Sequence, residues 1–166
     1  GAHVVVCGRR EARGQEVVDQ IGADGGSASF HRMDLTDLST VDALMADTAR
    51  DYGSIDVLVN NAAGVGLKDG RVDEISLEDW DAMFASGVRG TFYAIKAILP
   101  YMRAAGGGSI VNIGSMASIS GDLGSTAYAC SKAGVDMLTS SVALQYGKEN
   151  IRCNCVRPGL IVTPQN

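Results

Sequence analysis

Tyr128 and Lys132 stand four residues apart in an amphipathic stretch, and Ser115 precedes the tyrosine by thirteen positions. Residues at i and i+4 share one face of a helix, so the phenol and the ammonium group can point the same way. A free phenol, with a pKa of about 10, is a poor base at neutral pH, but a neighbouring cation favours the phenolate. A serine hydroxyl nearby could donate to a substrate carbonyl and stabilise charge developing on its oxygen. The three side chains therefore predict acid–base chemistry at a carbonyl or hydroxyl group.

Short β-branched runs alternate with longer helical patterns, and together they predict the elements that position these side chains. Ser76 and Asp79 form a capping-box pattern that opens a long helix running toward Met102. Alternating strands and helices predict one α/β domain over residues 1–166, a doubly wound, mostly parallel sheet with helices on both faces. Ligands of such sheets bind beyond the carboxyl ends of the strands. The predicted strands are residues 3–7, 27–33, 55–61, 109–115 and 151–156.

The composition argues against two classes of binding partner. The net charge of −5 and the pI near 4.9 argue against nucleic acid and against an anionic membrane surface, because both recruit clustered lysine and arginine. The apolar runs are far shorter than the ~20 residues that cross a bilayer. We therefore expect neither nucleic acid nor a membrane as partner.

The cysteines and histidines do not have the spacing of metal ligands. Cys153 and Cys155 alternate with polar residues, which predicts two buried thiols on one face of a strand and a reducing, cytoplasmic setting. His3 and His31 lie in strand patterns with no carboxylate nearby in the sequence, so ordinary sheet positions are expected. No metal is predicted.

The residues that follow the first strand indicate which nicotinamide nucleotide the protein would bind. Arg9 and Arg10 come directly after Gly8. Arginine suits a ribose 2′-phosphate, whereas an acidic residue would accept hydrogen bonds from a 2′-hydroxyl, so the charge favours NADP(H) over NAD(H). Two solvated arginines before a helix are the alternative interpretation.

Three further strand ends carry polar or small residues. The DLTD segment at 34–37 could hydrogen-bond an adenine amine through Asp34, with Thr36 or Asp37 capping the next helix. The NNAAG segment at 60–64 would let a ligand approach the backbone closely, although a tight turn explains it nearly as well. After the last strand, the turn at Pro158 and Gly159 and the hydroxyl of Thr163 could meet an amide-bearing ligand.

Together these segments resemble the short-chain dehydrogenase/reductase family over essentially the whole chain. DLTD, VNNA, GSIVNIGS, YACSK and RPGLIVT occur in the family's order and at its spacing. The resemblance implies a Rossmann-like fold and hydride transfer between a nicotinamide and a secondary alcohol or ketone. Tyr128 would exchange a proton with the substrate oxygen, Lys132 would lower the pKa of that phenol and bind the nicotinamide ribose, and Ser115 would orient the substrate oxygen.

The resemblance also implies cofactor contacts and a homodimer or homotetramer, formed through the long helix at 77–102 and the helix that carries Tyr128. Arg9 would hold the 2′-phosphate of NADP(H). The other implied contacts are Asp34 and Leu35 at the adenine, Asn61 and Ala62 along the adenosine, and Pro158, Gly159, Ile161 and Thr163 at the nicotinamide end.

Two departures from the family pattern stand out. The glycine-rich phosphate loop T-G-x-x-x-G-x-G does not occur, and the chain starts at the glycine before what resembles the family's second strand. The missing first strand would lie between the first and third strands here, and the last family strand is also absent. We therefore expect an incomplete sheet, belonging to a fragment of a longer enzyme, with no turnover by the 166 residues alone.

The second departure is Gly87, where the family usually carries an asparagine whose backbone carbonyl serves a water chain. Glycine keeps that carbonyl and permits a helix kink, at a cost of about 1 kcal/mol.

Two alternatives to an oxidoreductase remain open at this point. An epimerase or dehydratase would use the same fold and tyrosine with a different outcome. A non-catalytic binding or scaffold protein is favoured by Gly87 and the missing phosphate loop, but opposed by the intact spacing of Ser115, Tyr128 and Lys132.

Overall fold

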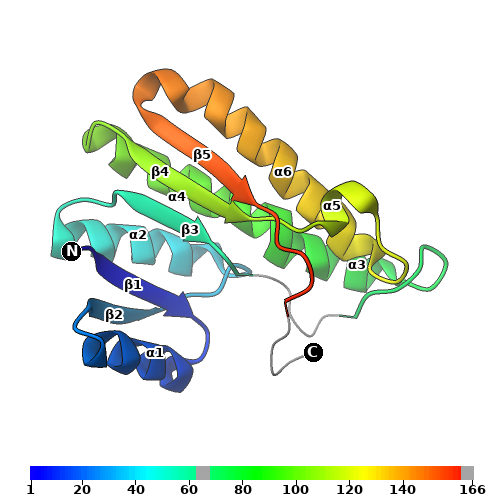
Figure 1. Ribbon diagram of the computed structural model, residues 1–166, viewed down its shortest axis with the longest axis horizontal. Helices are drawn as coiled ribbons and strands as arrows, with labels where there is room; N and C mark the ends of the chain where they lie inside the picture. Colours follow the sequence, from blue (N-terminus) through cyan, green and yellow to red (C-terminus); the bar gives the residue numbers. More distant parts are fainter. Residues whose placement is uncertain (63–67, 162–166) are drawn as a thin grey trace.

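The computed structural model describes residues 1–62 and 68–161, and its strands follow the predicted ones closely. All strand pairings are parallel, so the carboxyl ends of the strands meet at one edge (Figure 1). The predicted α/β, Rossmann-like architecture is confirmed. The strands are β1 (His3–Gly8), β2 (Ser27–Arg32), β3 (Val57–Asn60), β4 (Gly108–Ile113) and β5 (Ile151–Val156).

The helices alternate with the strands, and two of them begin at the capping residues that the sequence indicated. The Ser76 hydroxyl accepts from the Asp79 amide, which confirms the capping box, and Asp37 rather than Thr36 caps the preceding long helix. The helices are α1 (Glu11–Ala23), α2 (Leu38–Tyr52), α3 (Leu77–Phe84), α4 (Gly90–Ala104), α5 (Ala117–Ser120) and α6 (Thr126–Tyr146), with a π-helical turn η1 (Ala85–Arg89) and a 3₁₀ turn η2 (Gly147–Glu149).

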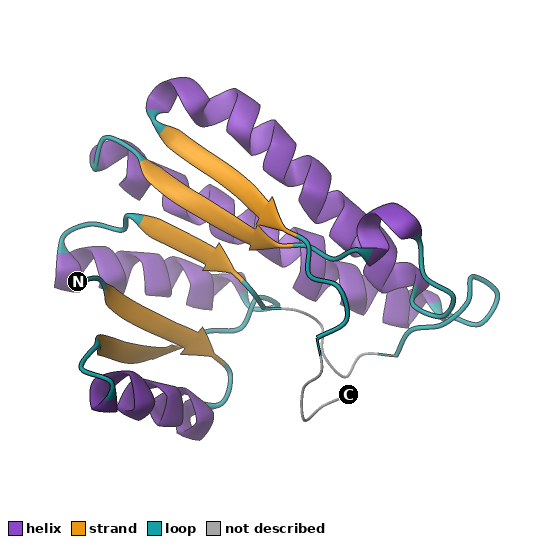
Figure 2. Ribbon diagram, in the orientation of Figure 1, coloured by secondary structure: helices purple, strands orange, loops and turns teal. Residues whose placement is uncertain are grey.

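The strands form two separate sheets. β1 pairs with β2, and β3, β4 and β5 form a second sheet in that order, with no pairing between β1 and β3 in the described part of the chain (Figure 2). The facing edges of β1 and β3 therefore have unpaired backbone groups. Val57 and Val59 of β3 are 58% and 56% exposed. The gap lies where the sequence predicted a missing strand.

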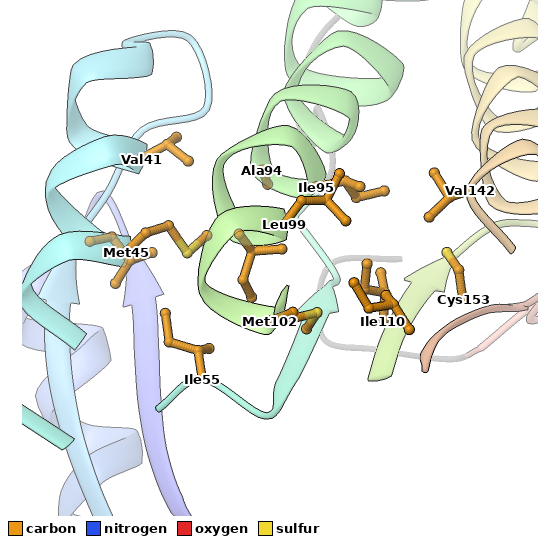
Figure 3. Close-up of a cluster of buried hydrophobic side chains, with 13 residues drawn as sticks. Val41, Met45, Ile55, Ala94, Ile95, Leu99, Met102, Ile110, Val142 and Cys153 are labelled. Carbon is orange, nitrogen blue, oxygen red and sulfur yellow. The ribbon is translucent and has the colours of Figure 1, made fainter. Parts of the chain in front are cut away.

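One hydrophobic core nevertheless joins the two sheets through the helices (Figure 3). Ile98 and Met102 of α4 and Ile110 of β4 are fully buried at its centre. Val5 of β1 packs against the same cluster, so α2 and α4 bridge the gap. α1 packs separately on the other face of the small sheet, where Gly14 lies directly over the Phe30 ring. The elements that meet at the strand ends are therefore held by buried helices rather than by a continuous strand ladder.

None of the helices in the described ranges combines the length and the apolar character needed to cross a bilayer.

Candidate active site

Lys132 of α6 is buried beside Tyr128, as the spacing predicted. The lysine is only 7% exposed, and its Nζ lies 5.7 Å from the centroid of the Tyr128 ring. Nζ also donates to the carbonyl of Ile113, the last residue of β4, at 2.6 Å. Burial lowers the pKa of Lys132, and the nearby Cys155 and Asp136 oppose that shift. The amine is thus fixed between the phenol and the carboxyl end of β4.

Ser115 lies two residues beyond β4, in the turn that opens α5. Its Oγ accepts from the Ala117 amide at 3.2 Å, and its carbonyl accepts from the Ser118 hydroxyl at 2.7 Å. Because Lys132 contacts Ile113 at the end of the same strand, the three predicted catalytic residues gather around one strand end.

A carboxylate from a distant loop caps the helix that carries Tyr128. Ser125 makes no side-chain cap, and Asp69 takes its place: its two oxygens accept from the Ala127 amide at 3.0 Å and the Tyr128 amide at 2.8 Å. The Thr126 amide donates to the Gly70 carbonyl at 3.2 Å. Sequence analysis missed Asp69, since no local pattern links residues almost sixty positions apart.

Gly87 produces the predicted kink between α3 and α4. Its φ of −88° and ψ of −107° interrupt the helix within η1. The kink brings α6 very close: the Ser131 hydroxyl accepts from the Val88 amide at 3.1 Å, and a Cβ added to Gly87 would lie 2.1 Å from that oxygen. The family resemblance implied a kink that Gly87 permits, but not the contact with Ser131, the residue directly before Lys132.

Replacing Gly87 with alanine should therefore destabilise the protein, although helix propensity alone favours alanine by about 1 kcal/mol. Overpacking against Ser131 should lower the free energy of unfolding by about 1–3 kcal/mol, as measured by urea denaturation. Adding Ser131→Ala removes the clashing oxygen, so the double variant should lose less than the sum of the two single changes. An alanine variant as stable as the parent would contradict this contact.

The predicted adenosine contacts lie beyond β1 and β2. Arg9 is exposed directly after β1, and Oδ1 of Asp34 accepts from the Thr36 amide at 2.9 Å and the Thr36 hydroxyl at 2.7 Å. These hydrogen bonds lower the pKa of Asp34, with smaller electrostatic contributions from Arg9 and Arg32. Leu35 has a packing role as well, because a Cβ added to Gly90 would lie 2.9 Å from the Leu35 Cβ.

Asn61 and Ala62 follow β3 and are exposed, whereas Asn60 belongs to a buried network that the sequence did not indicate. The Asn60 amide donates to Oδ1 of Asn112 at 2.8 Å, and the Asn112 amide donates to the Thr139 hydroxyl at 2.8 Å. Asn112 has no exposed surface. The network ties β3, β4 and α6 together behind the site.

The segment after β5 meets the Ser115 turn. The Pro158 carbonyl accepts from the Met116 amide at 3.0 Å, and the Val156 carbonyl accepts from the Gly114 amide at 2.8 Å. Gly159 and Ile161 follow as exposed residues, whereas Thr163 lies outside the described residues.

Two expectations about single residues need correction. Cys153 is buried as predicted, but Cys155 is only half-buried, and its thiol donates to Asp136 at 3.0 Å. His31 has a carboxylate partner after all, since its Nε2 lies 3.0 Å from Asp47 of α2. Residues 31 and 47 are distant in sequence, which is why the pattern did not show the pair. Within residues 1–62 and 68–161, no group of three or more histidine, cysteine or acidic side chains could hold a metal ion.

A family model and two known dehydrogenases are similar in sequence to this chain. A family model described as short chain dehydrogenase matches residues 1–166. A probable short-chain type dehydrogenase/reductase from Bradyrhizobium diazoefficiens is 45% identical over 131 residues, which are 78% of this chain and 47% of that protein. The 7alpha-hydroxysteroid dehydrogenase of Bacteroides fragilis is 36% identical over 99% of this chain and 64% of its own length.

Two solved structures have a fold similar to that of this chain. A putative short-chain dehydrogenase/reductase from Burkholderia xenovorans superimposes with a TM-score of 0.94 at 34% identity, covering 99% of this chain and 62% of that one. A gluconate 5-dehydrogenase from Burkholderia cenocepacia, in complex with NADP and tartrate, superimposes with a TM-score of 0.91 at 28% identity, covering 100% and 64%. The chain thus spans about half to two thirds of the length of these relatives. Because the family model matches it from its first residue to its last, this chain belongs to the short-chain dehydrogenase family.

Proposed function

We propose that this sequence is the catalytic part of an NADP(H)-dependent oxidoreductase that interconverts a secondary alcohol and a ketone. The observation that carries the proposal is the buried amine of Lys132, held 5.7 Å from the Tyr128 ring centroid at the carboxyl end of β4. A lysine is costly to bury, and this placement next to a phenol has no evident packing purpose. Membership of the short-chain dehydrogenase family supports the same chemistry.

In the direction of reduction, Tyr128 gives its phenolic proton to the substrate oxygen, and the charged Lys132 stabilises the phenolate that remains. The Ser115 hydroxyl donates a hydrogen bond to the same oxygen as negative charge develops on it. The nicotinamide, when bound, would supply the hydride that reduces the carbonyl carbon. In the direction of oxidation, the Tyr128 phenolate accepts the proton of the alcohol.

The residues beyond β1 and β2 fit the adenosine half of NADP(H). Arg9 is an exposed cation at the strand end and would bind the 2′-phosphate, while Asp34 and Leu35 would border the adenine. Asn61 and Ala62 would lie along the adenosine. Pro158, Gly159, Ile161 and Thr163 would hold the nicotinamide end.

A complete cofactor site needs polypeptide outside these 166 residues. Within the described residues no strand lies between β1 and β3, and the sequence has no glycine-rich phosphate loop that would bind the pyrophosphate. In the complete protein, we expect α4 and α6 to pair with a second copy, giving a homodimer or homotetramer. Exposed apolar side chains on these helices, Phe92, Met137 and Leu144, support this interface.

Titration of the purified protein with NADPH and NADH, together with its intact mass, tests the proposal. A polypeptide that includes the missing strand and loop should bind NADPH about tenfold or more tightly than NADH, because hydrogen bonds to charged groups contribute roughly 1.5–3 kcal/mol. Arg9→Gln should abolish the preference. The 166 residues alone should neither bind nor turn over the cofactor. If the longer polypeptide binds neither nucleotide, the protein is a non-catalytic relative and the proposal fails.

A further inference from the structure

Asp136 lies one turn after Lys132 on α6 and collects hydrogen bonds from three other segments. Its side chain is only 12% exposed. It accepts from the Ser118 hydroxyl of α5, from the Cys155 thiol of β5 at 3.0 Å, and from Nε of Arg157 at 2.8 Å. Burying a carboxylate to this extent destabilises the folded state unless the carboxylate is paired and hydrogen-bonded, and Asp136 is both.

Two of these partners belong to the turns that carry proposed site residues. Ser118 closes the turn of Ser115, since its hydroxyl also lies 2.7 Å from the Ser115 carbonyl. Arg157 directly precedes Pro158, whose carbonyl accepts from the Met116 amide in the Ser115 turn. One carboxylate therefore ties both strand-end turns to the helix that presents Tyr128 and Lys132.

The atoms around Asp136 are tightly packed. Gly114 lies between the end of β4 and Ser115, and a Cβ added there would lie 2.7 Å from the Cys155 sulfur and 2.9 Å from Oδ1 of Asp136. Such close approach means that a movement of Asp136 is passed directly to the backbone next to Ser115.

The charges around Lys132 give Asp136 a second effect. The groups near the amine are Tyr128 and Asp136 on its own helix and Cys155 on β5, with Arg157 paired to Asp136. Burial lowers the pKa of Lys132, whereas Cys155 and Asp136 raise it. Desolvation would raise the pKa of Asp136, but its hydrogen bonds from Ser118, Cys155 and Arg157 outweigh this and lower it. Burial and the contact with Asp136 raise the pKa of the Cys155 thiol, so at neutral pH the thiol donates to an ionised carboxylate.

We propose that Asp136 is a positioning residue, which fixes the Ser115 turn and the Arg157–Pro158 segment relative to Tyr128 and Lys132. This inference rests on the proposed function and adds to it a residue outside the Ser-Tyr-Lys group. No local sequence pattern indicates this role, because the partners of Asp136 lie 18 to 21 positions away.

The test uses the polypeptide that is active with NADPH and follows kcat and KM against pH. Asp136→Asn keeps one acceptor but removes the charge and leaves the Arg157 guanidinium unpaired near Lys132. We expect kcat to fall about 10- to 100-fold, since small misplacements near the reacting atoms have effects of this size. The lysine should also lose its proton at lower pH, so the alkaline limb of the kcat profile should move to lower pH.

Arg157→Gln gives a prediction of opposite sign. It leaves Asp136 unpaired and therefore more strongly attracted to Lys132, so the alkaline limb should move to higher pH. Arg157 is 42% exposed, and its replacement should leave the fold intact even if changes at Asp136 do not. Opposite shifts from the two partners of one ion pair would not result from a merely structural role.

Glu149→Gln is the matched control. It breaks the ion pair between Arg103 and Glu149, at 2.5 Å between α4 and η2, beyond the end of α6 that is opposite to Tyr128. Its kcat and pH profile should equal those of the parent. If Asp136→Asn folds and keeps the parent's kcat and alkaline limb, or if both Asp136 and Arg157 variants shift that limb the same way, the inference is wrong while the proposed function stands. A parent that binds NADPH but turns over no alcohol or ketone would refute the proposed function, and the role of Asp136 with it.

Discussion

Tyr128→Phe should lower kcat by about 100- to 10,000-fold in the polypeptide that is active with NADPH, because the change removes the one proton that the substrate oxygen is proposed to exchange. The ring itself stays, and with it the surface that Lys132 faces at 5.7 Å from the centroid. NADPH binding should therefore remain within a few-fold of the parent. Steady-state kinetics and a fluorescence titration separate the two effects.

Tyr146→Phe serves as the control for this prediction. Tyr146 ends the same helix, and the guanidinium carbon of Arg103 lies 5.2 Å from the centroid of its ring. Its hydroxyl has no proposed part in the reaction, so kcat should be unchanged. Retention of more than a tenth of the parent's kcat by Tyr128→Phe would show that another group moves the proton.

Asn112→Leu should lower the free energy of unfolding by about 2–3 kcal/mol. Asn112 is completely buried, and both ends of its side chain are engaged, by Asn60 and by Thr139. Leucine has a similar volume but leaves the half-buried Asn60 amide without its acceptor, and an unsatisfied group costs roughly 1–3 kcal/mol. Urea denaturation of the purified protein measures the change.

Asn154→Leu is the matched comparison for Asn112. Asn154 lies on the neighbouring strand β5 but is exposed, so its replacement should change stability by about 0.5 kcal/mol or less. Equal effects of the two substitutions would mean that the network around Asn112 adds nothing to stability.

Features encoded by local patterns were predictable from the sequence. The five strands and the capping box at Ser76 depend on neighbours within a few positions, where periodicity and caps act, whereas the kink that Gly87 permits was implied by the resemblance. The shared face of Tyr128 and Lys132 follows from helix geometry alone. The gap between β1 and β3 could be predicted only because the resemblance supplied a strand order.

What the sequence did not indicate are contacts between residues that are far apart along the chain. Asp69 reaches the first turn of α6 across almost sixty positions, and Asn112 binds partners on two other elements. The same holds for Gly87 and Ser131, where only packing shows why a side chain would not fit. The side chains of Asp69, Asn112 and Ser131 each carry a polar group whose partner is decided by tertiary structure, and no local rule identifies that partner.

The split between the two sheets also bears on how cooperatively the chain unfolds. Neighbouring strands normally share a hydrogen-bond ladder, and none joins β1 to β3 in the described chain. In the described chain, α1, β1 and β2 are attached to the rest through side-chain contacts rather than a strand ladder, among them the core packing with α2 and α4, the His31–Asp47 pair and the Tyr52–Ser29 hydrogen bond. Such a unit can open without disturbing β3, β4 and β5, so its free energy of opening should lie below that of global unfolding. A strand inserted into the gap would bond to both edges and merge the two units into one.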